Sequence, residues 1–268
     1  MTELRREVLI LRAQLRSRPL ISQAQGILQE RYRLPDADAA FGLLRDSSQR
    51  YNVKLRNLAA AVVAAPRPEP GAAQWFPHRA RRPSPTLRFL PGVRPDRLDR
   101  NTVLRTVLSR ALAVGATGMG NVQVVDPGMG GLRIEEHQGF GEEFLDFFAH
   151  VESAHADGTG TICALAAERG TRVASRISTD PIFSEQAREV ILATGSRMAH
   201  SVPMLGASGR CVGVFSLHQP GPPRDLTDSQ ASRLEGIAGQ AGRWLEWHQR
   251  TVVLDALEHL HREASKRH

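Results

Sequence analysis

Apolar residues recur at every third or fourth position in three blocks near the start of the chain, a spacing typical of amphipathic helices. The three blocks are Ile21, Ala24, Ile27 and Leu28, then Ala40, Phe41 and Leu44, then Leu55, Leu58, Ala59 and Val62. Pro35 and Asp36 stand where the second helix should begin, and Asn52 is a candidate N-cap for the third. Because helices this short are unstable alone, the pattern predicts one three-helix bundle over residues 18–64.

A fourth apolar stripe precedes the bundle. Leu4, Val8, Leu11 and Leu15 are spaced 4, 3 and 4 residues apart, as are the a and d positions of two heptads. Residues 1–17 are therefore predicted to form a coiled-coil-like helix that pairs with its own copy or with another helix of the chain. A homodimer is the favoured arrangement, because a bundle of about 60 residues buries too little surface to be stable alone.

Proline dominates residues 65–100, which hold 8 of the chain's 16 prolines. This composition cannot propagate a helix and predicts a flexible, semi-extended linker. Trp75, Phe76 and the arginines within residues 79–82 interrupt it. Two interpretations stay open: these side chains could stack on unpaired bases and touch phosphates, or the two aromatic residues could dock on a neighbouring domain.

Beyond residue 100 helical and strand patterns alternate. Helical spacing begins at Asn101, a candidate N-cap, and returns over residues 142–151, 162–168, 184–194 and from 228 to about 264. Strand-like segments are residues 121–125, 131–134, 171–175, 201–205 and 211–218, the last two forming a hairpin. This order predicts an α/β domain with an antiparallel sheet and flanking helices over residues 101–250. A helical tail over residues 251–268 follows, and the terminal helix could carry a second dimer contact through Leu245, Val253, Leu257 and Leu260.

Charge is distributed unevenly between these predicted domains. Residues 1–65 carry 11 Lys and Arg against 6 Asp and Glu, residues 66–100 carry 8 against 3, and the remainder carries 16 against 19. A basic head beside a neutral-to-acidic domain favours binding of a polyanion. Because no apolar run approaches the roughly 20 residues that cross a bilayer, no membrane partner is expected.

Few residues suggest catalysis or metal binding. Cys163 and Cys211 lack a Cys-x-x-Cys spacing, so neither a disulfide framework nor a zinc site is supported, and a cytoplasmic location fits. The adjacent acidic residues of the pairs 135–136 and 142–143 point to different sides and are expected to be solvated. His259 and His261 are two apart on a helix and make a poor metal clip. No catalytic residue and no metal ligand is predicted.

The first predicted domain resembles the ANTAR domain, a three-helix module of bacterial RNA-binding transcription antiterminators. The resemblance lies in Arg18 and Ile21, in residues 23–28, in Ala40, Phe41, Leu44 and Arg45, and in Asn52, Lys54, Leu55, Arg56 and Ala59. Gln25 stands where the family commonly has a lysine. The resemblance implies RNA contacts by Arg18, Gln23, Gln25, Arg45, Arg50, Asn52, Lys54 and Arg56. Two alternatives stay open: Arg45 could pair with Asp46 or Glu30, and the bundle could be a protein-interaction or dimerisation module without RNA binding.

The second half resembles a GAF domain. The resemblance lies in residues 118–126, 139–140, 172–173, 178–183, 201–204 and 209–216. It implies a concave ligand site between one sheet face and the helices over it. The candidate wall residues are Gln123, Thr161, Ile162, Cys163, Leu165, Val202, Met204 and Phe215, and the glycine-rich residues 158–161 before a helix could hold an anion. No cofactor is identified; an unknown small-molecule effector is one interpretation, and a cavity filled by its own side chains is the other.

The cysteines leave one enzymatic alternative open. Near a helix start, Cys163 would have a depressed pKa if exposed, whereas a buried cysteine behaves as a small hydrophobe. One enzymatic relative of GAF domains reduces free methionine sulfoxide through paired cysteines, and Cys163 with Cys211 would have to serve here. The favoured function is instead a bacterial regulator that binds stem-loop RNA in nascent transcripts. It would promote antitermination, act on the transcription complex indirectly, and respond to its GAF sensor domain.

Overall fold

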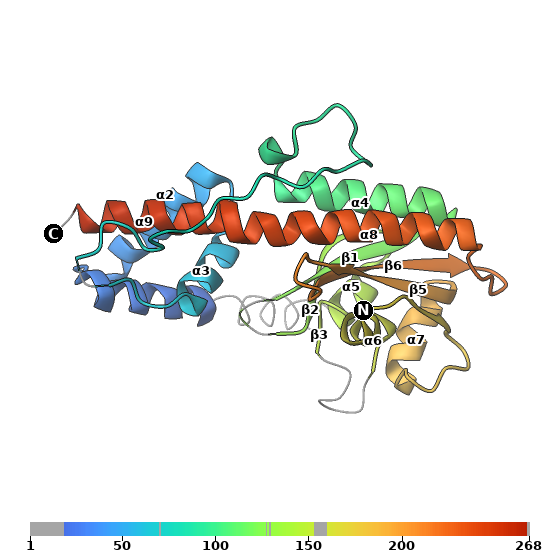
Figure 1. The fold of residues 1–268 in the computed structure, drawn as a ribbon. Coiled ribbons are helices and arrows are strands. Elements are labelled where there is room, and N and C mark those ends of the chain that lie inside the picture. Colours follow the sequence, from blue (N-terminus) through green and yellow to red (C-terminus); the bar gives the residue numbers. More distant parts are fainter. Residues whose placement is uncertain (1–18, 70, 127, 129, 153–159, 267–268) are drawn as a thin grey trace. The chain divides into compact units, whose positions relative to one another are not determined.

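The computed structural model describes residues 19–69, 71–126, 128, 130–152 and 160–266, and they divide into two units (Figure 1). The bundle unit comprises the described residues up to Arg82 and those from His248 onward. The sheet unit comprises the described residues from Pro83 to Trp247. The predicted coiled-coil residues 1–17 and Arg18 lie outside the described part of the chain.

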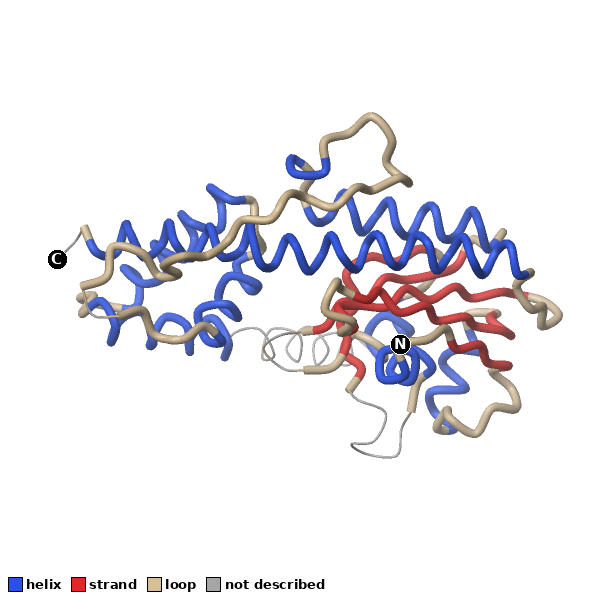
Figure 2. Tube along the Cα trace, viewed as in Figure 1, coloured by secondary structure: helices blue, strands red, loops and turns tan. Residues whose placement is uncertain are grey.

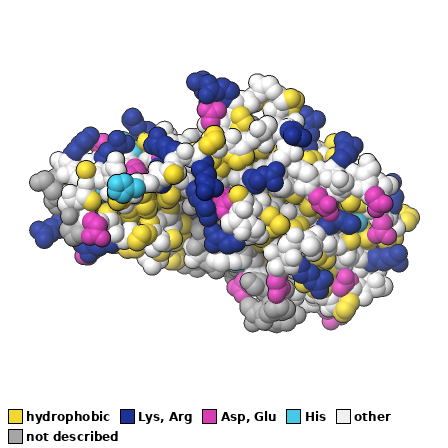
Figure 3. All heavy atoms as spheres, viewed as in Figure 1, with side chains coloured by type: hydrophobic (Ala, Val, Ile, Leu, Met, Phe, Trp, Pro, Cys, Tyr) yellow, Lys and Arg dark blue, Asp and Glu magenta, His cyan; other side chains and the backbone are white. Residues whose placement is uncertain are grey.

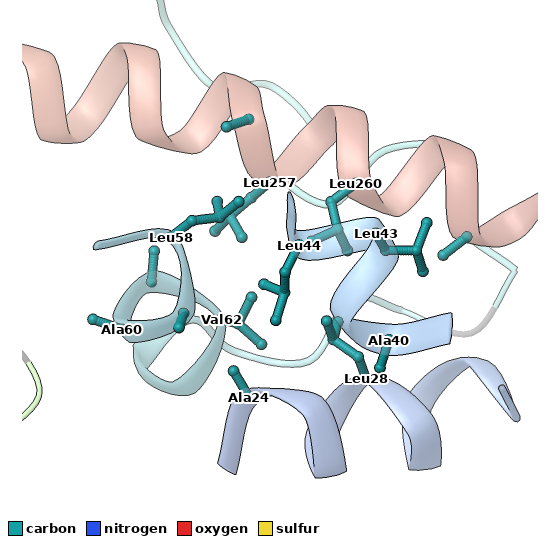
Figure 4. Packing of buried hydrophobic residues seen from close by; sticks show 14 of the residues in the cluster. Ala24, Leu28, Ala40, Leu43, Leu44, Leu58, Ala60, Val62, Leu257 and Leu260 are labelled. Atoms are coloured by element: carbon teal, nitrogen blue, oxygen red, sulfur yellow. The ribbon is translucent and has the colours of Figure 1, made fainter. Parts of the chain in front are cut away.

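Four helices build the bundle unit. Residues 19–32 form the first helix, α2 spans Ala37–Tyr51, α3 spans Leu55–Ala64 and α9 spans Leu254–Ser265. Apolar side chains of all four meet in one buried cluster, labelled in Figure 4 with Ala24, Leu28, Ala40, Leu43, Leu44, Leu58, Ala60, Val62, Leu257 and Leu260. The predicted three-helix bundle is present, and the C-terminal helix of the same chain completes its core.

This packing changes the role predicted for the C-terminal helix. Val253, Leu257 and Leu260 are buried in the cluster of their own bundle unit, and Leu245 is buried in the sheet unit. A side chain already buried within its own unit offers little surface to a second copy. The dimer contact predicted for these four residues is therefore wrong.

Helix ends follow the predicted capping chemistry at some positions and not at others. The side chains of Thr161 and Ser184 cap α6 and α7. Asn52 does not begin α3: it ends α2 in the left-handed conformation, with a φ of 49°, which asparagine tolerates better than most residues. Asn101 does not begin α4 either: the cap is Asp99, two residues earlier, whose carboxylate accepts the backbone N–H of Thr102.

The sheet unit holds six antiparallel strands in the order β3-β2-β1-β6-β5-β4. The strands are β1 Met119–Val125, β2 Leu132–Gln138, β3 His150–Val151, β4 Val173–Arg176, β5 Ser196–Leu205 and β6 Cys211–Pro220. One sheet face is covered by α4 (Arg100–Gly115) and α8 (Asp228–His248). A short 3₁₀ turn at Pro95–Arg97 precedes α4 in the chain. The other face is covered by α5 (Glu142–Phe147), α6 (Ile162–Arg169) and α7 (Glu185–Ala193), as Figures 1 and 2 show.

Tertiary packing overrides two local predictions around β2. The helix predicted over residues 142–151 ends at Phe147, because His150 and Val151 pair with Arg133 and Leu132 as an edge strand. Glu135 is not solvated: only 1% of its side chain is exposed, and it forms ion pairs with Arg133 and with Arg100, the latter at 3.3 Å. The expectation of a solvated acidic pair was therefore wrong at Glu135.

Residues 65–100 do not behave as a free tether along their described length. Trp75 is buried in the bundle unit, and its indole Nε1–H donates to the carbonyl oxygen of Pro66 at 2.8 Å. The carboxylate of Glu258 on α9 accepts the backbone N–H groups of Trp75 and Phe76 at 3.0 and 2.7 Å. Leu87 is buried in the sheet unit. Of the two interpretations of the aromatic pair, docking is the one that matches the structure.

Arg79 is likewise committed to protein contacts. A π-helical stretch, Gln249–Val253, precedes α9, and such a turn disturbs the regular backbone hydrogen bonding. The guanidinium of Arg79 donates to the carbonyl oxygens of Arg250 at 2.9 Å and Thr251 at 3.2 Å, and it also pairs with Asp255. Arg79 is therefore not available to a phosphate.

No helix in the described part of the chain is long and apolar enough to span a membrane.

Candidate functional site

A small cavity lies between the sheet and the helices α5, α6 and α7. Its volume is about 30 Å³, enough for roughly two water molecules. The lining residues are Asn121, Gln123, Phe144, Phe148, Thr161, Ile162, Cys163, Phe183, Ile191, Ala199, Ser216 and His218. None of these side chains carries a formal charge at neutral pH, so the cavity is polar without being ionic.

Two buried amide groups give the cavity its polarity. Asn121 and Gln123 project from β1 on the cavity side, while Val122 between them faces the core under α4 and α8. Among the described residues, the Oδ1 atom of Asn121 and the Oε1 atom of Gln123 have no hydrogen-bond partner. A buried acceptor without a partner costs about 1–3 kcal/mol. The two oxygens therefore favour a guest that donates hydrogen bonds.

Phe144 and Phe148 of the α5 segment and His218 of β6 also line the cavity. Phe144 of α5 stacks on Phe140 with ring centroids 3.9 Å apart, and both rings meet the imidazole of His218 edge-on. Burial lowers the pKa of His218 to about 3, with a smaller contribution from His200, so the imidazole is neutral at physiological pH. Its Nδ1 atom lies 3.1 Å from the hydroxyl oxygen of Ser196. The cavity lining thus combines apolar ring faces with one uncharged imidazole.

The predicted pocket residues fall on both sides of the sheet. Gln123, Thr161, Ile162 and Cys163 line the cavity. Val202, Met204 and Phe215 lie instead in the core beneath α4 and α8, and Leu165 does not line the cavity, so these four predictions were wrong. Strand alternation could have separated the two sets, since Ser216 and His218 of β6 take the opposite side from Phe215.

A second, more open cleft of about 600 Å³ lies at the ends of the central strands. Its lining includes Leu132, Val151, Glu168, Arg210 and Cys211. Its volume lies in the range of small-molecule sites. Its walls differ from those of the smaller cavity in carrying both acidic and basic side chains.

The two cysteines face different cavities. Cys163 lines the small cavity, where its Sγ atom lies 3.1 Å from the hydroxyl oxygen of Thr161, whereas Cys211 lines the open cleft. Burial raises the pKa of both thiols, which lowers their reactivity. Of the two interpretations of Cys163, the buried small hydrophobe is the one observed. In the described part of the chain, no group of three His, Cys, Asp or Glu side chains could hold a metal ion.

The candidate RNA-binding residues are distributed over three helices of the bundle. Gln23 is exposed on the first helix, but the side-chain amide of Gln25 donates to the carbonyl oxygen of Ala37 at 3.0 Å and so ties that helix to α2. Arg45 pairs with Asp46 at 3.1 Å, and more than half of each side chain is exposed. Such a surface pair is weak and yields readily to a phosphate.

The turn between α2 and α3 gathers the other candidates. Arg50 and Asn52 are exposed at the end of α2, Lys54 is exposed at the start of α3, and Arg56, two residues further on, is half-buried. Lys and Arg side chains stand on the surface of the bundle with hydrophobic side chains between them, as Figure 3 shows for one face.

Residues 158 and 159 of the anion site predicted in the second half of the chain lie outside the described residues.

Comparison with protein-family models assigns both units. The GAF domain model matches residues 99–244, which is more than half of the chain, and the ANTAR domain model matches residues 10–63. The chain belongs to the GAF domain family. Its N-terminal bundle is an ANTAR domain. The arrangement predicted from sequence, ANTAR first and GAF second, is confirmed, and the protein is a regulator with a sensor domain.

Solved structures similar to the GAF domain come from several bacteria. A GAF domain/HD domain protein from Geobacter sulfurreducens is 13% identical, with 57% of this chain and 96% of that chain covered and a TM-score of 0.47. The second GAF domain of DevS from Mycobacterium smegmatis is 21% identical, with 56% and 94% covered and a TM-score of 0.40. The free methionine-R-sulfoxide reductase from Neisseria meningitidis is 18% identical, with 56% and 81% covered and a TM-score of 0.42. No curated protein matches the chain.

Proposed function

We propose that the chain is a cytoplasmic RNA-binding regulator. Its ANTAR domain would bind stem-loops in nascent transcripts, and its GAF domain would adjust that binding in response to a small molecule. The observation that carries the proposal is the ANTAR match over residues 10–63, on a bundle whose α2–α3 turn presents Arg50, Asn52 and Lys54 to solvent. Cations there suit phosphates, and the Asn52 amide suits a base edge in a loop.

Antitermination is the regulatory outcome that we infer. A dimer paired through residues 1–17 would hold the transcript in a hairpin that excludes the terminator hairpin, so that the transcription complex continues. The heptad spacing of Leu4, Val8, Leu11 and Leu15 supports that pairing. The action on the transcription complex is then indirect, through the structure of the RNA.

The effector that suits the small cavity is uncharged, donates hydrogen bonds and has a flat apolar face. The amide oxygens of Asn121 and Gln123 would accept its donors, and the rings of Phe144 and Phe148 would cover its face. A charged effector would be disfavoured, since no ionic side chain lines the cavity. At about 30 Å³ the cavity admits an effector only if wall side chains move aside.

Effector binding would change RNA affinity by favouring one state of the protein. The required coupling is about 1–3 kcal/mol, which corresponds to roughly 5- to 150-fold in affinity. The two domains are covalently connected at this point: α8 of the GAF domain continues through residues Gln249–Val253 into α9 of the bundle. A change at the effector site could be transmitted to the bundle through this connection. The effector must therefore bind one of the two states more tightly than the other.

RNA binding is tested by titrating the full chain with a hairpin RNA, with a duplex of equal length as the control. The full chain is required because a fragment of the first 100 residues would lack α9. Four to six phosphate contacts predict a slope of log affinity against log salt of about −3 to −4, at about −0.7 per contact. Tight, salt-sensitive binding that prefers the hairpin supports the proposal. Salt-insensitive binding or none would favour a protein-interaction module.

The sensor is tested by mass spectrometry of small molecules that co-purify with the full chain. A neutral compound that is released on denaturation, and that raises the melting temperature when added back, supports the effector class. The variant Gln123→Met tests the site, because it keeps the side-chain length but removes the amide, and it should retain less of the compound. An anionic compound, or equal retention by Gln123→Met and the wild type, would contradict the proposed effector class.

A further inference from the structure

The C-terminal helix α9 carries a strip of polar residues that its role in the bundle core does not use. Its apolar residues Leu257, Leu260 and Ala264 are buried against α2, α3 and the first helix. His259, Arg262 and Lys266 are spaced 3 and 4 residues apart, which places them on one face of the helix, away from the buried side. Arg262 and Lys266 are exposed and His259 is half-buried.

The end of α2 meets this face of α9. The rings of Tyr51 and His259 lie with their centroids 5.7 Å apart and are tilted by 47°. Arg50, the residue before Tyr51, is exposed, and Asn52 and Lys54 of the candidate RNA-binding turn follow directly. Two segments from opposite ends of the chain therefore form one surface.

The electrostatics of His259 show that cations gather around it. Burial is the main cause that lowers the pKa of His259, and the positive charge of Arg50 is the next. Arg262 and Lys266 lower the pKa further, while Glu263 acts in the opposite direction. Glu263 and Lys266 pair at 2.7 Å with side-chain exposures of 40% and 70%, so this ion pair is open to exchange.

We propose that the RNA-binding surface continues from the α2–α3 turn onto α9. The α2–α9 strip, defined as Arg50, Tyr51, His259, Arg262 and Lys266, contacts RNA that leaves the loop held by the turn. The proposal rests on the RNA-binding function proposed above. The three cations meet phosphates, and the Tyr51–His259 ring pair offers a stacking surface for an unpaired base.

The composition of the strip favours RNA over an acidic protein surface. Cations that flank two adjacent aromatic rings match a backbone of phosphates interleaved with flat bases. Arg262 and Lys266 sit one helical turn apart, with their Cβ atoms about 5–6 Å from each other. A purely structural alternative is that these cations stabilise the C-terminus of α9 through the helix dipole. That alternative predicts a loss of stability rather than of RNA affinity.

The test uses full-length variants and the hairpin RNA titration at several salt concentrations. The double variant Arg262→Gln/Lys266→Gln removes two cations from the strip. The matched control Arg105→Gln/Arg110→Gln removes two exposed cations from α4 in the GAF domain. We expect the salt slope of the strip variant to become shallower by about 1.4, at about 0.7 per lost contact, with the control unchanged. Both variants should melt at the temperature of the wild type.

Stacking is tested separately with a fluorescent base analogue in the single strand beside the hairpin. Tyr51→Ala is expected to weaken binding by roughly 5- to 150-fold, the range for one stacked base, and to abolish the quenching of the analogue. Tyr51→Phe should restore both signals, because the ring is kept. Failure of Tyr51→Phe to restore them would overturn the stacking role.

The outcomes separate this inference from the proposed function. If the wild type ignores the hairpin, the RNA-binding function itself fails. If the wild type binds and the strip variant keeps the wild-type slope, α9 does not contact RNA. An equal loss in the strip and control variants would mean that only the net charge matters. A strip variant that keeps RNA binding but loses binding to a polyglutamate probe would assign the strip to an acidic protein.

Discussion

The hydroxyl oxygen of Tyr32 lies 2.7 Å from the Nδ1 atom of His261, although 229 positions separate the two residues in the chain. The other nitrogen of that imidazole, Nε2, lies 2.8 Å from the carbonyl oxygen of Ala72. Because a carbonyl oxygen only accepts, Nε2 donates to Ala72, and the Tyr32 hydroxyl donates its hydrogen bond to Nδ1. Burial raises the pKa of Tyr32 to about 12, so the phenol keeps this proton. The His261 imidazole of α9 thus links the first helix, through Tyr32, with the segment that contains Ala72 and Trp75, called the docked segment below.

The ANTAR domain should therefore depend on α9 for its stability. Leu257→Ala removes a fully buried side chain from the shared cluster and should cost about 2–5 kcal/mol. The expected result is faster hydrogen exchange in peptides from residues 19–64, measured by mass spectrometry on the full chain. Leu234→Ala, which empties an equally buried position in the GAF domain, is the matched control. Unchanged protection of residues 19–64 in Leu257→Ala would contradict the shared core.

Glu258 should hold the docked segment around Trp75. In Glu258→Ala the backbone N–H groups of Trp75 and Phe76 lose their acceptor, at a cost of about 1–3 kcal/mol. We expect faster exchange of these two amide hydrogens and an increase in the exposure of Trp75, read from its fluorescence quenching. Glu263→Ala removes an exposed carboxylate of the same helix and should leave both signals as in the wild type.

The sequence pattern predicted the helices of the ANTAR domain because each has its own apolar stripe, and Pro35–Asp36 marks the start of the second. It could not assign α9 to them. The stripe of Val253, Leu257 and Leu260 predicts only that one face is buried, and a partner in a second copy satisfies that pattern equally well. Only the three-dimensional packing decides between the two partners.

The cavity shows a similar limit. Gln123, Thr161 and Cys163 were predicted as wall residues from the resemblance to a GAF domain, whereas the aromatic residues Phe144 and Phe148 were not predicted. Val202, Met204 and Phe215 were placed on the wrong sheet face, since a strand buried on both faces gives no polar-to-apolar alternation that marks one face as solvent-exposed. In β6 the polar residues Ser216 and His218 carried the only signal for the cavity side.

The cavity should be optimised for binding at the expense of stability. Gln123→Met removes a buried acceptor that has no partner among the described residues while filling the same space. The GAF domain of this variant should be more stable by roughly 1 kcal/mol in the absence of effector. Urea unfolding of the full chain, followed by the CD signal of the sheet, measures this change. A destabilised variant would show that the Gln123 amide serves the fold rather than a guest.

The stability of the GAF domain should fall in mildly acidic solution because of His218. Its pKa is about 3 in the folded protein against 6.5 for an exposed imidazole. Between these two pH values the imidazole is protonated in the unfolded chain but not in the folded one. The free energy of unfolding should drop by about 1.4 kcal/mol between pH 7.5 and 5.5 from this group. Burial also lowers the pKa of His200, which adds a change of the same sign. Urea unfolding at the two pH values should show a smaller drop in His218→Gln than in the wild type. His137→Gln, which alters an exposed histidine of β2, should keep the wild-type drop, and an equal drop in all three proteins would rule out His218 as its source.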